Sequence, residues 1–233
     1  KVEYVPGMLF FGVKTLENVK FGKSVKRIGE AAFRGCTGLT KVDFPDGIET
    51  IGDNAFLLTN IEFFFLPTSI KSVEGGIQTS NLKQVICIAK EAPIAYWGHN
   101  SDLKLYVPNT LQYSKKWYTY ESGQIQPMIK ADKETIYYTG KAPTVTFTSN
   151  IPGYELVSLT KDYVLNGEVG EDSVRLVGTF KGEKEFTVEM TYHYEVKPGK
   201  QEVTWEQDLS NLHVGDKVEL TASVNTGREM WYV

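Results

Sequence analysis

The feature that most constrains the fold of this chain is an apolar pattern that recurs about every 22 residues over its first ninety residues. The stretches "IGEAAFRGCTGL", which starts at Ile28, and "IGDNAFLLTNI", which starts at Ile51, both place a glycine after an aliphatic residue and an Ala-Phe pair shortly afterwards. Four copies align on one leucine-like position, which is occupied by Leu16, Leu39, Ile61 and Leu82. A steady interval of this length is typical of a repeat architecture, in which each copy forms one structural unit.

Each copy has the pattern of a short strand followed by a turn. Val42 and Phe44 alternate with charged residues and therefore share one face of a strand. Pro45 ends this strand because proline has no backbone N–H for the ladder. The alignment places Leu66 of the next copy level with Phe44. The strand positions thus recur from copy to copy.

The rest of each copy supplies further inward-facing residues. Ile48 and Ile51 suit a second short strand or turn, and "AAFRGC" suits about one turn of helix with Phe33 pointing inward. A single coil of this size cannot bury its own apolar edge, so successive coils must stack. The sequence therefore predicts a solenoid, with the glycines at its corners.

The segment Ile28–Phe56, "IGEAAFRGCTGLTKVDFPDGIETIGDNAF", resembles the BspA-type leucine-rich repeat family of bacteria, because its Gly, Ala-Phe, Cys, Leu and Pro residues all fall in register. The resemblance covers residues 8–94 and weakens in later copies, where "LLT" replaces "GCT" and "VEGGIQTSNL" lacks the Ala-Phe pair. It implies a secreted or surface-anchored bacterial protein, and some members of the family mediate adhesion. The implied fold class is mainly β, with a leucine-rich-repeat solenoid.

The segment Ala92–Tyr120 resembles the closing module of such arrays. "LKLYVP" is expected to form a last strand, followed by a short capping helix with Asn109 or Thr110 as its N-cap. The side chains expected to be partly buried under this cap are Leu111, Tyr113 and Trp117. We assign residues 1–125 to the solenoid and its cap.

The pattern changes after about residue 129 to short strands separated by turn signals. The expected strands are Glu134–Thr139, Pro143–Ser149, Tyr154–Leu159, Ser173–Phe180 and Glu185–Val196. We assign residues 126–199 to a small β-sandwich, which resembles bacterial immunoglobulin-like (Ig-like) domains in architecture only, because the Cys…Trp…Cys core is missing. Residues 200–233 resemble a partial second Ig-like domain that is cut short. Because the chain begins with Lys1 rather than Met, we expect a fragment of a longer protein.

Composition and motifs argue against several functions. A net charge of −4 and the lack of a basic patch make nucleic acid an unexpected partner. No stretch is long and apolar enough for a membrane helix, and none of the common catalytic or metal-binding motifs occurs, so we expect no enzyme activity, no cofactor and no metal. The acidic segment Asp46–Asn54 is interpreted as a solvated turn, not a calcium loop. Cys36 and Cys87 are favoured as buried free thiols over a disulfide.

The outward-facing strand positions change from charged to aromatic along the array. Phe63 and Phe65, with Ile86 in the next copy, would form an apolar patch suited to a contact. The alternative is that the cap, the sandwich or the loop containing Tyr96 and Trp97 covers this patch. These five residues are the candidate binding residues.

We therefore expect a non-enzymatic bacterial cell-surface or secreted protein. It would bind a protein or glycan ligand at a surface, or mediate host adhesion, through the repeats, with the Ig-like modules as a stalk. A carbohydrate-binding module that uses exposed aromatic rings, and a structural spacer without a ligand, are the alternatives.

Overall fold

A computed structural model of the chain describes residues 1–75, 77, 79, 81–97, 100–117, 124–133, 135–137, 143–160, 168–199, 203–205 and 222–224. The chain divides into two compact units. Unit 1 comprises Lys1–Lys130, Ser149–Leu159 and Val177–Met190, and unit 2 comprises Ala131–Thr148, Thr160–Leu176 and Thr191–Val233. This division is not the contiguous one that the sequence suggests, because two later segments cluster with the repeats.

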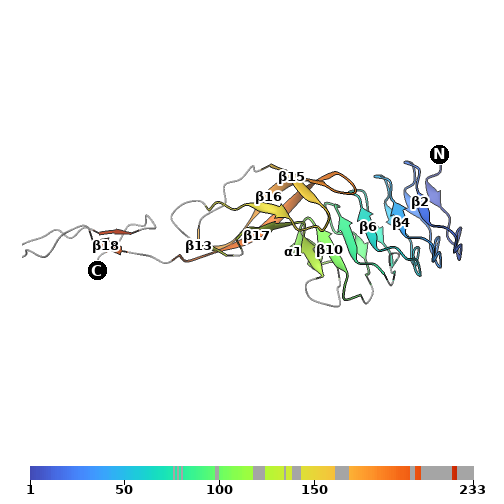
Figure 1. Ribbon diagram of the computed structural model, residues 1–233, viewed down its shortest axis with the longest axis horizontal. Helices are drawn as coiled ribbons and strands as arrows, with labels where there is room; N and C mark the ends of the chain where they lie inside the picture. The colour runs from blue at the N-terminus through green and yellow to red at the C-terminus, as the bar shows by residue number, and fades with distance from the viewer. Residues whose placement is uncertain are drawn as a thin grey trace, which may run out of the picture. The chain divides into compact units, whose positions relative to one another are not determined.

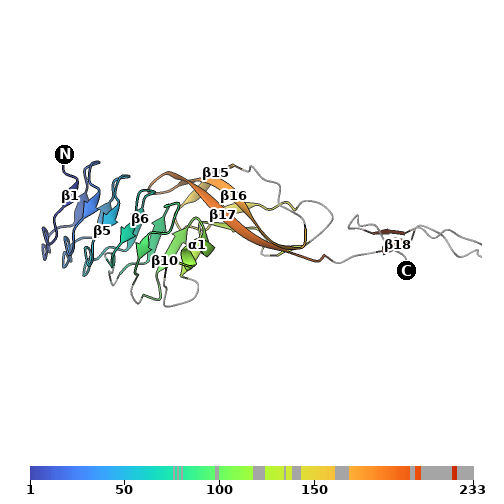
Figure 2. The same cartoon turned by 180° about the vertical axis from the view of Figure 1, so that it is seen from behind.

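One ladder of unit 1 contains five two-residue parallel strands, one per coil. The coils follow one another from the N-terminus, coloured from blue to green in Figure 1. They are β1 (Tyr4–Val5), β3 (Arg27–Ile28), β5 (Thr50–Ile51), β7 (Ser72–Val73) and β9 (Ile94–Ala95), paired in that order. Val5, Ile28, Ile51 and Val73 are in register and buried. The solenoid predicted from the interval is therefore confirmed in these residues, and the coils stack side by side from the N-terminal end (Figure 2).

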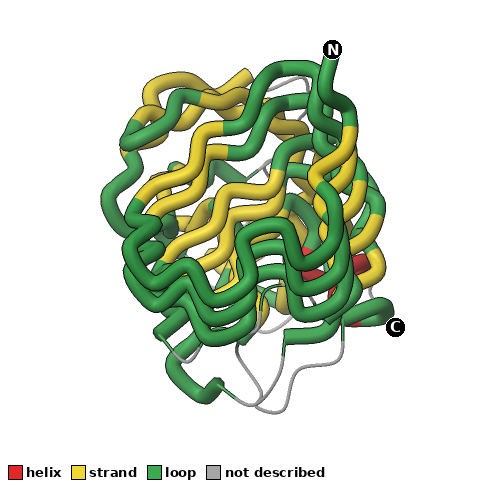
Figure 3. The backbone as a smooth tube through the Cα atoms, turned by 90° about the vertical axis from the view of Figure 1, so that its right-hand side faces the viewer, coloured by secondary structure: helices red, strands yellow, loops and turns green. Residues whose placement is uncertain are grey.

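The second ladder follows another side of the coils (Figure 3). Its strands are β2 (Asn18–Lys20), β4 (Lys41–Asp43), β6 (Phe63–Leu66), β8 (Gln84–Cys87), β10 (Lys104–Val107) and β11 (Ile125–Pro127). β2 pairs with β4, and β6, β8, β10 and β11 form a separate parallel sheet. The ladder is thus interrupted between β4 and β6.

Two rows of stacked phenylalanine rings fill the core of the first three coils. Phe33 stacks between Phe10 and Phe56, with 5.2 Å between ring centroids on each side. In the second row, Phe44 stacks on Phe21 at 5.9 Å and on Phe64 at 5.8 Å. Sequence alignment places Leu66 level with Phe44, but it is the ring of Phe64 that continues the row where the strand ladder is interrupted.

The "AAFRGC" segment is not a helical turn, so this prediction is wrong. Ala31 has a φ of 53° and Gly35 a φ of 75°, in the left-handed region. These dihedrals turn the backbone N–H groups along the stack, and the amides of Ala31, Phe33 and Gly35 donate to carbonyls of the next coil over 2.8–2.9 Å. An α-helix would instead bond each N–H to the fourth residue before it.

The corner glycines permit this close stacking. A Cβ atom placed on Gly29 would lie 2.4 Å from the amide nitrogen of Gly7 in the preceding coil. At the equivalent Gly52 it would lie 2.8 Å from the amide nitrogen of Glu30. Side chains cannot be accommodated at such distances, so the repeated glycine is required by the approach of two backbones.

A short cap closes the later coils. Helix α1 (Thr110–Ser114) begins after Asn109, whose side-chain oxygen accepts a hydrogen bond from the amide of Gln112 at 3.0 Å. Tyr113 within the helix and Trp117 just after it are buried, as expected, whereas Leu111 is exposed, contrary to expectation. The parallel strand β11 then extends the ladder beyond β10.

The later part of the chain is rich in strands, as predicted. β13 (Ile136–Tyr137), β17 (Phe186–Lys197), β16 (Gly170–Lys181) and β15 (Glu155–Thr160) form one sheet in that order, and β12 (Ile129–Ala131) pairs with β14 (Phe147–Ser149). In β17 the buried residues alternate with exposed ones such as Thr187 and Glu189, so one face of this strand is buried. The Ig-like architecture stays a prediction.

The segment interpreted as a partial second Ig-like domain, 200–233, is described only at β18 (Val203–Trp205) and β19 (Ala222–Val224), which pair in antiparallel fashion. The rest of this prediction lies outside the described residues.

Candidate functional site

The outward-facing side chains of the second ladder divide into an open half and a covered half. Lys20 and Asp43, on β2 and β4, are exposed. The corresponding outward positions on β6, β8 and β10 are occupied by Phe65, Ile86 and Tyr106, which are 9%, 0% and 6% exposed. The change from charged to apolar residues along the array therefore coincides with a change from exposed to buried.

The covering segment is the end of the β16–β17 hairpin that belongs to unit 1. The ring of Phe186 lies 5.2 Å from Phe65 and 5.2 Å from Phe180, and Tyr154 lies 5.7 Å from Phe186. The expected open patch is therefore wrong for Phe65 and Ile86, and the alternative, in which a later segment covers it, is confirmed. Phe63 is half-buried.

The other two candidate binding residues differ from each other. Trp97 is buried and packs edge-on against Trp117, with ring centroids 4.7 Å apart. It is part of the lid over the last coils, like Tyr113. Tyr96 is 42% exposed. Tyr118 and Tyr120, which follow Trp117 in the sequence, lie outside the described residues.

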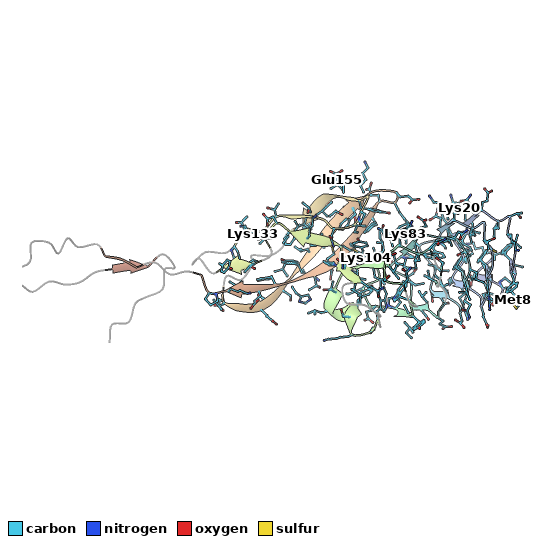
Figure 4. The ribbon with its side chains drawn as sticks, turned by 60° about the horizontal axis from the view of Figure 1, so that its bottom comes forward. Met8, Lys20, Lys83, Lys104, Lys133 and Glu155 are labelled. Carbon is cyan, nitrogen blue, oxygen red and sulfur yellow. The ribbon has the colours of Figure 1, made fainter. Side chains whose placement is uncertain are left out.

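A groove of about 770 Å³ opens where the covered half of the strand face meets the open half. Its apolar lining residues are Phe21, Val42, Phe44, Pro45, Phe63 and Phe65. Its charged lining residues are Lys20, Lys23, Lys41, Asp43, Asp46, Glu62, Glu183 and Lys184. Figure 4 shows Lys20 on β2, in the open half, and Lys83 and Lys104 further along the array. The groove thus combines an apolar floor with charges of both signs.

The turn between β16 and β17 forms one end of the groove. The Lys41 Nζ donates a hydrogen bond to Glu183, and the Lys184 Nζ lies 3.4 Å from Asp46 Oδ1 and 4.7 Å from the centre of the Phe65 ring. The hydrogen bond and charge of Glu183 raise the pKa of Lys41. The two ion pairs join residues 142 and 138 positions apart, and no local pattern in the sequence predicts contacts over such separations.

Other reactive groups do not converge. Among the described residues, no group of three or more His, Cys, Asp or Glu side chains could hold a metal ion, and no helix is long and apolar enough to cross a membrane. His99 and His213 lie outside the described residues.

Cys36 and Cys87 are free and buried, which confirms the interpretation of two separate thiols. Burial raises the pKa of Cys87 to about 11, so this thiol stays protonated and unreactive at neutral pH.

Comparison with known proteins identifies the family of the repeats. No curated protein and no solved structure matches the chain. The family model described as "BspA type Leucine rich repeat region" matches residues 1–94 in six copies, two more than the four aligned from the sequence. Residues 1–94, whose coils form the groove's strand face, are therefore a BspA-type leucine-rich repeat region.

Proposed function

We propose that the chain is a non-enzymatic binding protein of the bacterial cell surface or of the secreted fraction. The repeat region recognises a protein partner and so mediates adhesion, and the strand-rich later part is an Ig-like stalk. The family of the repeats supports a role in protein interaction. We assign the chain no catalytic role, cofactor or metal.

The observation that carries this proposal is the groove on the open half of the strand face. Parallel strands from consecutive coils present Lys20, Asp43 and Lys41 side by side above an apolar floor that includes Phe63. Protein interfaces combine an apolar centre with a polar, solvent-accessible rim, as this groove does. A protein segment is therefore the ligand that fits it best.

The two alternatives fit less well. The glycan alternative places the sugar on Tyr96, Trp97, Trp117 or the aromatic residues of the later strands. Trp97 and Trp117 are buried, whereas Tyr96 is exposed. A spacer without a ligand would agree with the covered Phe65 and Ile86. However, it would not explain an open groove bordered by charges of both signs.

The test is a charge reversal inside the groove. The variant carrying Lys20→Glu and Asp43→Lys keeps the net charge but exchanges the two signs, and we expect it to lose about tenfold or more in affinity for a partner identified on an array of surface and extracellular-matrix proteins. The matched control is Lys104→Glu, an exposed lysine on β10 that occupies the strand position of Lys41 outside the groove. Equal binding by wild type, groove variant and control would contradict the proposal.

A further inference from the structure

We propose that residues 181–185, the tip of the β16–β17 hairpin, are an electrostatic latch that closes one end of the groove and opens by exchanging its ion pairs with those of a bound partner. The inference rests on the proposed function, since it concerns access to the same groove. It adds that the end of the groove formed by residues 181–185 can open and close. It also gives the chemical class of the partner, which is a protein segment that brings a carboxylate to Lys41.

The hairpin is anchored below its tip and not at the tip itself. Phe180, Phe186, Val188 and Met190 are at most 7% exposed, so the two strands are held to unit 1 by apolar packing. Within the tip, Lys181, Gly182, Glu183 and Glu185 are all exposed. The tip carries no apolar side chain that could hold it down.

The tip is held instead by charged contacts. Glu183 accepts from Lys41, Lys184 pairs with Asp46, and the same Lys184 lies over the ring of Phe65. Both ion pairs are solvent-exposed, so each shifts an equilibrium by about two- to fivefold and is weakened by salt. A tip held in this way opens while the packed strands beneath it stay closed.

A second contact, between the tip and residues 153–154, leaves no space for a side chain at Gly182. A Cβ on Gly182 would lie 2.6 Å from Cδ1 of Tyr154 and 2.7 Å from the carbonyl oxygen of Gly153. The closed tip therefore requires glycine at this position. The Tyr154 hydroxyl is also buried at this contact, where it faces the backbone of Lys184 in the tip, and burial raises its pKa.

Ion-pair exchange follows from this arrangement. When Glu183 moves away, Lys41 lies exposed in the groove, which Lys20 and Lys23 also line. An acidic side chain of a partner can then pair with Lys41 in place of Glu183, whose carboxylate is left exposed to water. A partner without an acidic side chain would have to break the Lys41–Glu183 ion pair without replacing it.

The experiment follows hydrogen–deuterium exchange of the full chain by mass spectrometry, with no partner present. In Lys41→Glu we expect amides of residues 181–185 to exchange about three- to fivefold faster than in wild type at low salt. The Lys41→Glu/Glu183→Lys variant should return to the wild-type rate because it restores the pair with the charges exchanged. In wild type, raising NaCl from about 20 mM to about 500 mM should accelerate the same amides.

Two further variants make the result specific. Gly182→Ala should raise exchange of the tip at both salt concentrations, because it acts through the contact with Tyr154 and not through charge. Lys71→Glu removes an exposed ion pair with Glu49 elsewhere on the coils and should leave the tip unchanged. Peptides covering residues 186–190 should exchange at the wild-type rate in every variant, which shows that the packed strand is intact.

The latch would be overturned if the hydrogen–deuterium exchange rate of residues 181–185 changed neither in Lys41→Glu nor with salt. It would also be overturned if the Lys41→Glu/Glu183→Lys variant did not return to the wild-type rate. That result would leave the proposed function standing, because a fixed wall can still border a binding groove. Conversely, a partner array that yields no binding would remove the function without changing the exchange result.

Discussion

At the scale of single residues, the repeat allows each coil to serve as a control for the next. Gly12 and Gly35 have a φ of 75°, and the equivalent residue of the third coil, Leu58, has a φ of 60°. The left-handed conformation is unfavourable for a residue with a Cβ by about 1–2 kcal/mol. Leu58 is 56% exposed and therefore gains little from burial in return. The third coil thus has the same backbone conformation at this position without a glycine.

Leu58→Gly should therefore raise the free energy of unfolding by about 1 kcal/mol, because the strain at this position is relieved at the expense of some backbone entropy. Gly35→Leu should lower it by about 1–2 kcal/mol for the converse reason. Urea unfolding followed by circular dichroism measures both. If Leu58→Gly lowered the free energy of unfolding instead, the claim that the positive φ of Leu58 costs more than its exposed side chain contributes would be contradicted.

At the scale of the elements, the sequence is informative wherever neighbours in the chain share a coil. The interval between Leu16, Leu39 and Ile61 predicts the stacking of coils, and the alternation of Phe186, Val188 and Met190 predicts one buried face of β17. In contrast, "AAFRGC" was misinterpreted as helical because its hydrogen bonds run to the next coil. Local residue propensities contain no information about a hydrogen-bond acceptor about 22 residues away in the next coil.

The stacked phenylalanine row is the element that should matter most for stability. Phe33 is fully buried between Phe10 and Phe56, so Phe33→Ala should cost about 3–5 kcal/mol in the free energy of unfolding. The matched control is Leu111→Ala in α1, where the side chain is 53% exposed and the effect should stay below about 1 kcal/mol. Denaturant unfolding compares the two, and equal losses would contradict the assignment of the core to the phenylalanine rows.

At the scale of the whole chain, the groove depends on contacts that no pattern in the sequence predicts. The sequence places Phe65 and Ile86 on the outward face of their strands, and their apolar character predicts an open ligand patch, which is wrong because both are buried. The contacting segment, with Phe186 at its centre, comes from the same chain more than a hundred residues later. The predicted ligand patch is thus an internal interface. The groove beside it, bordered by Glu183 and Lys184, follows only from the folded structure.

The most direct test of this account is hydroxyl-radical footprinting of the native chain, with oxidation of individual side chains measured by mass spectrometry. The account predicts that Phe65 and Phe186 are protected, whereas Tyr96 and the half-exposed Phe11 are oxidised readily. After denaturation all four should react. Oxidation of native Phe65 at a rate similar to that of Phe11 would show that the hairpin does not cover the strand face, and would contradict the division of that face on which the groove depends.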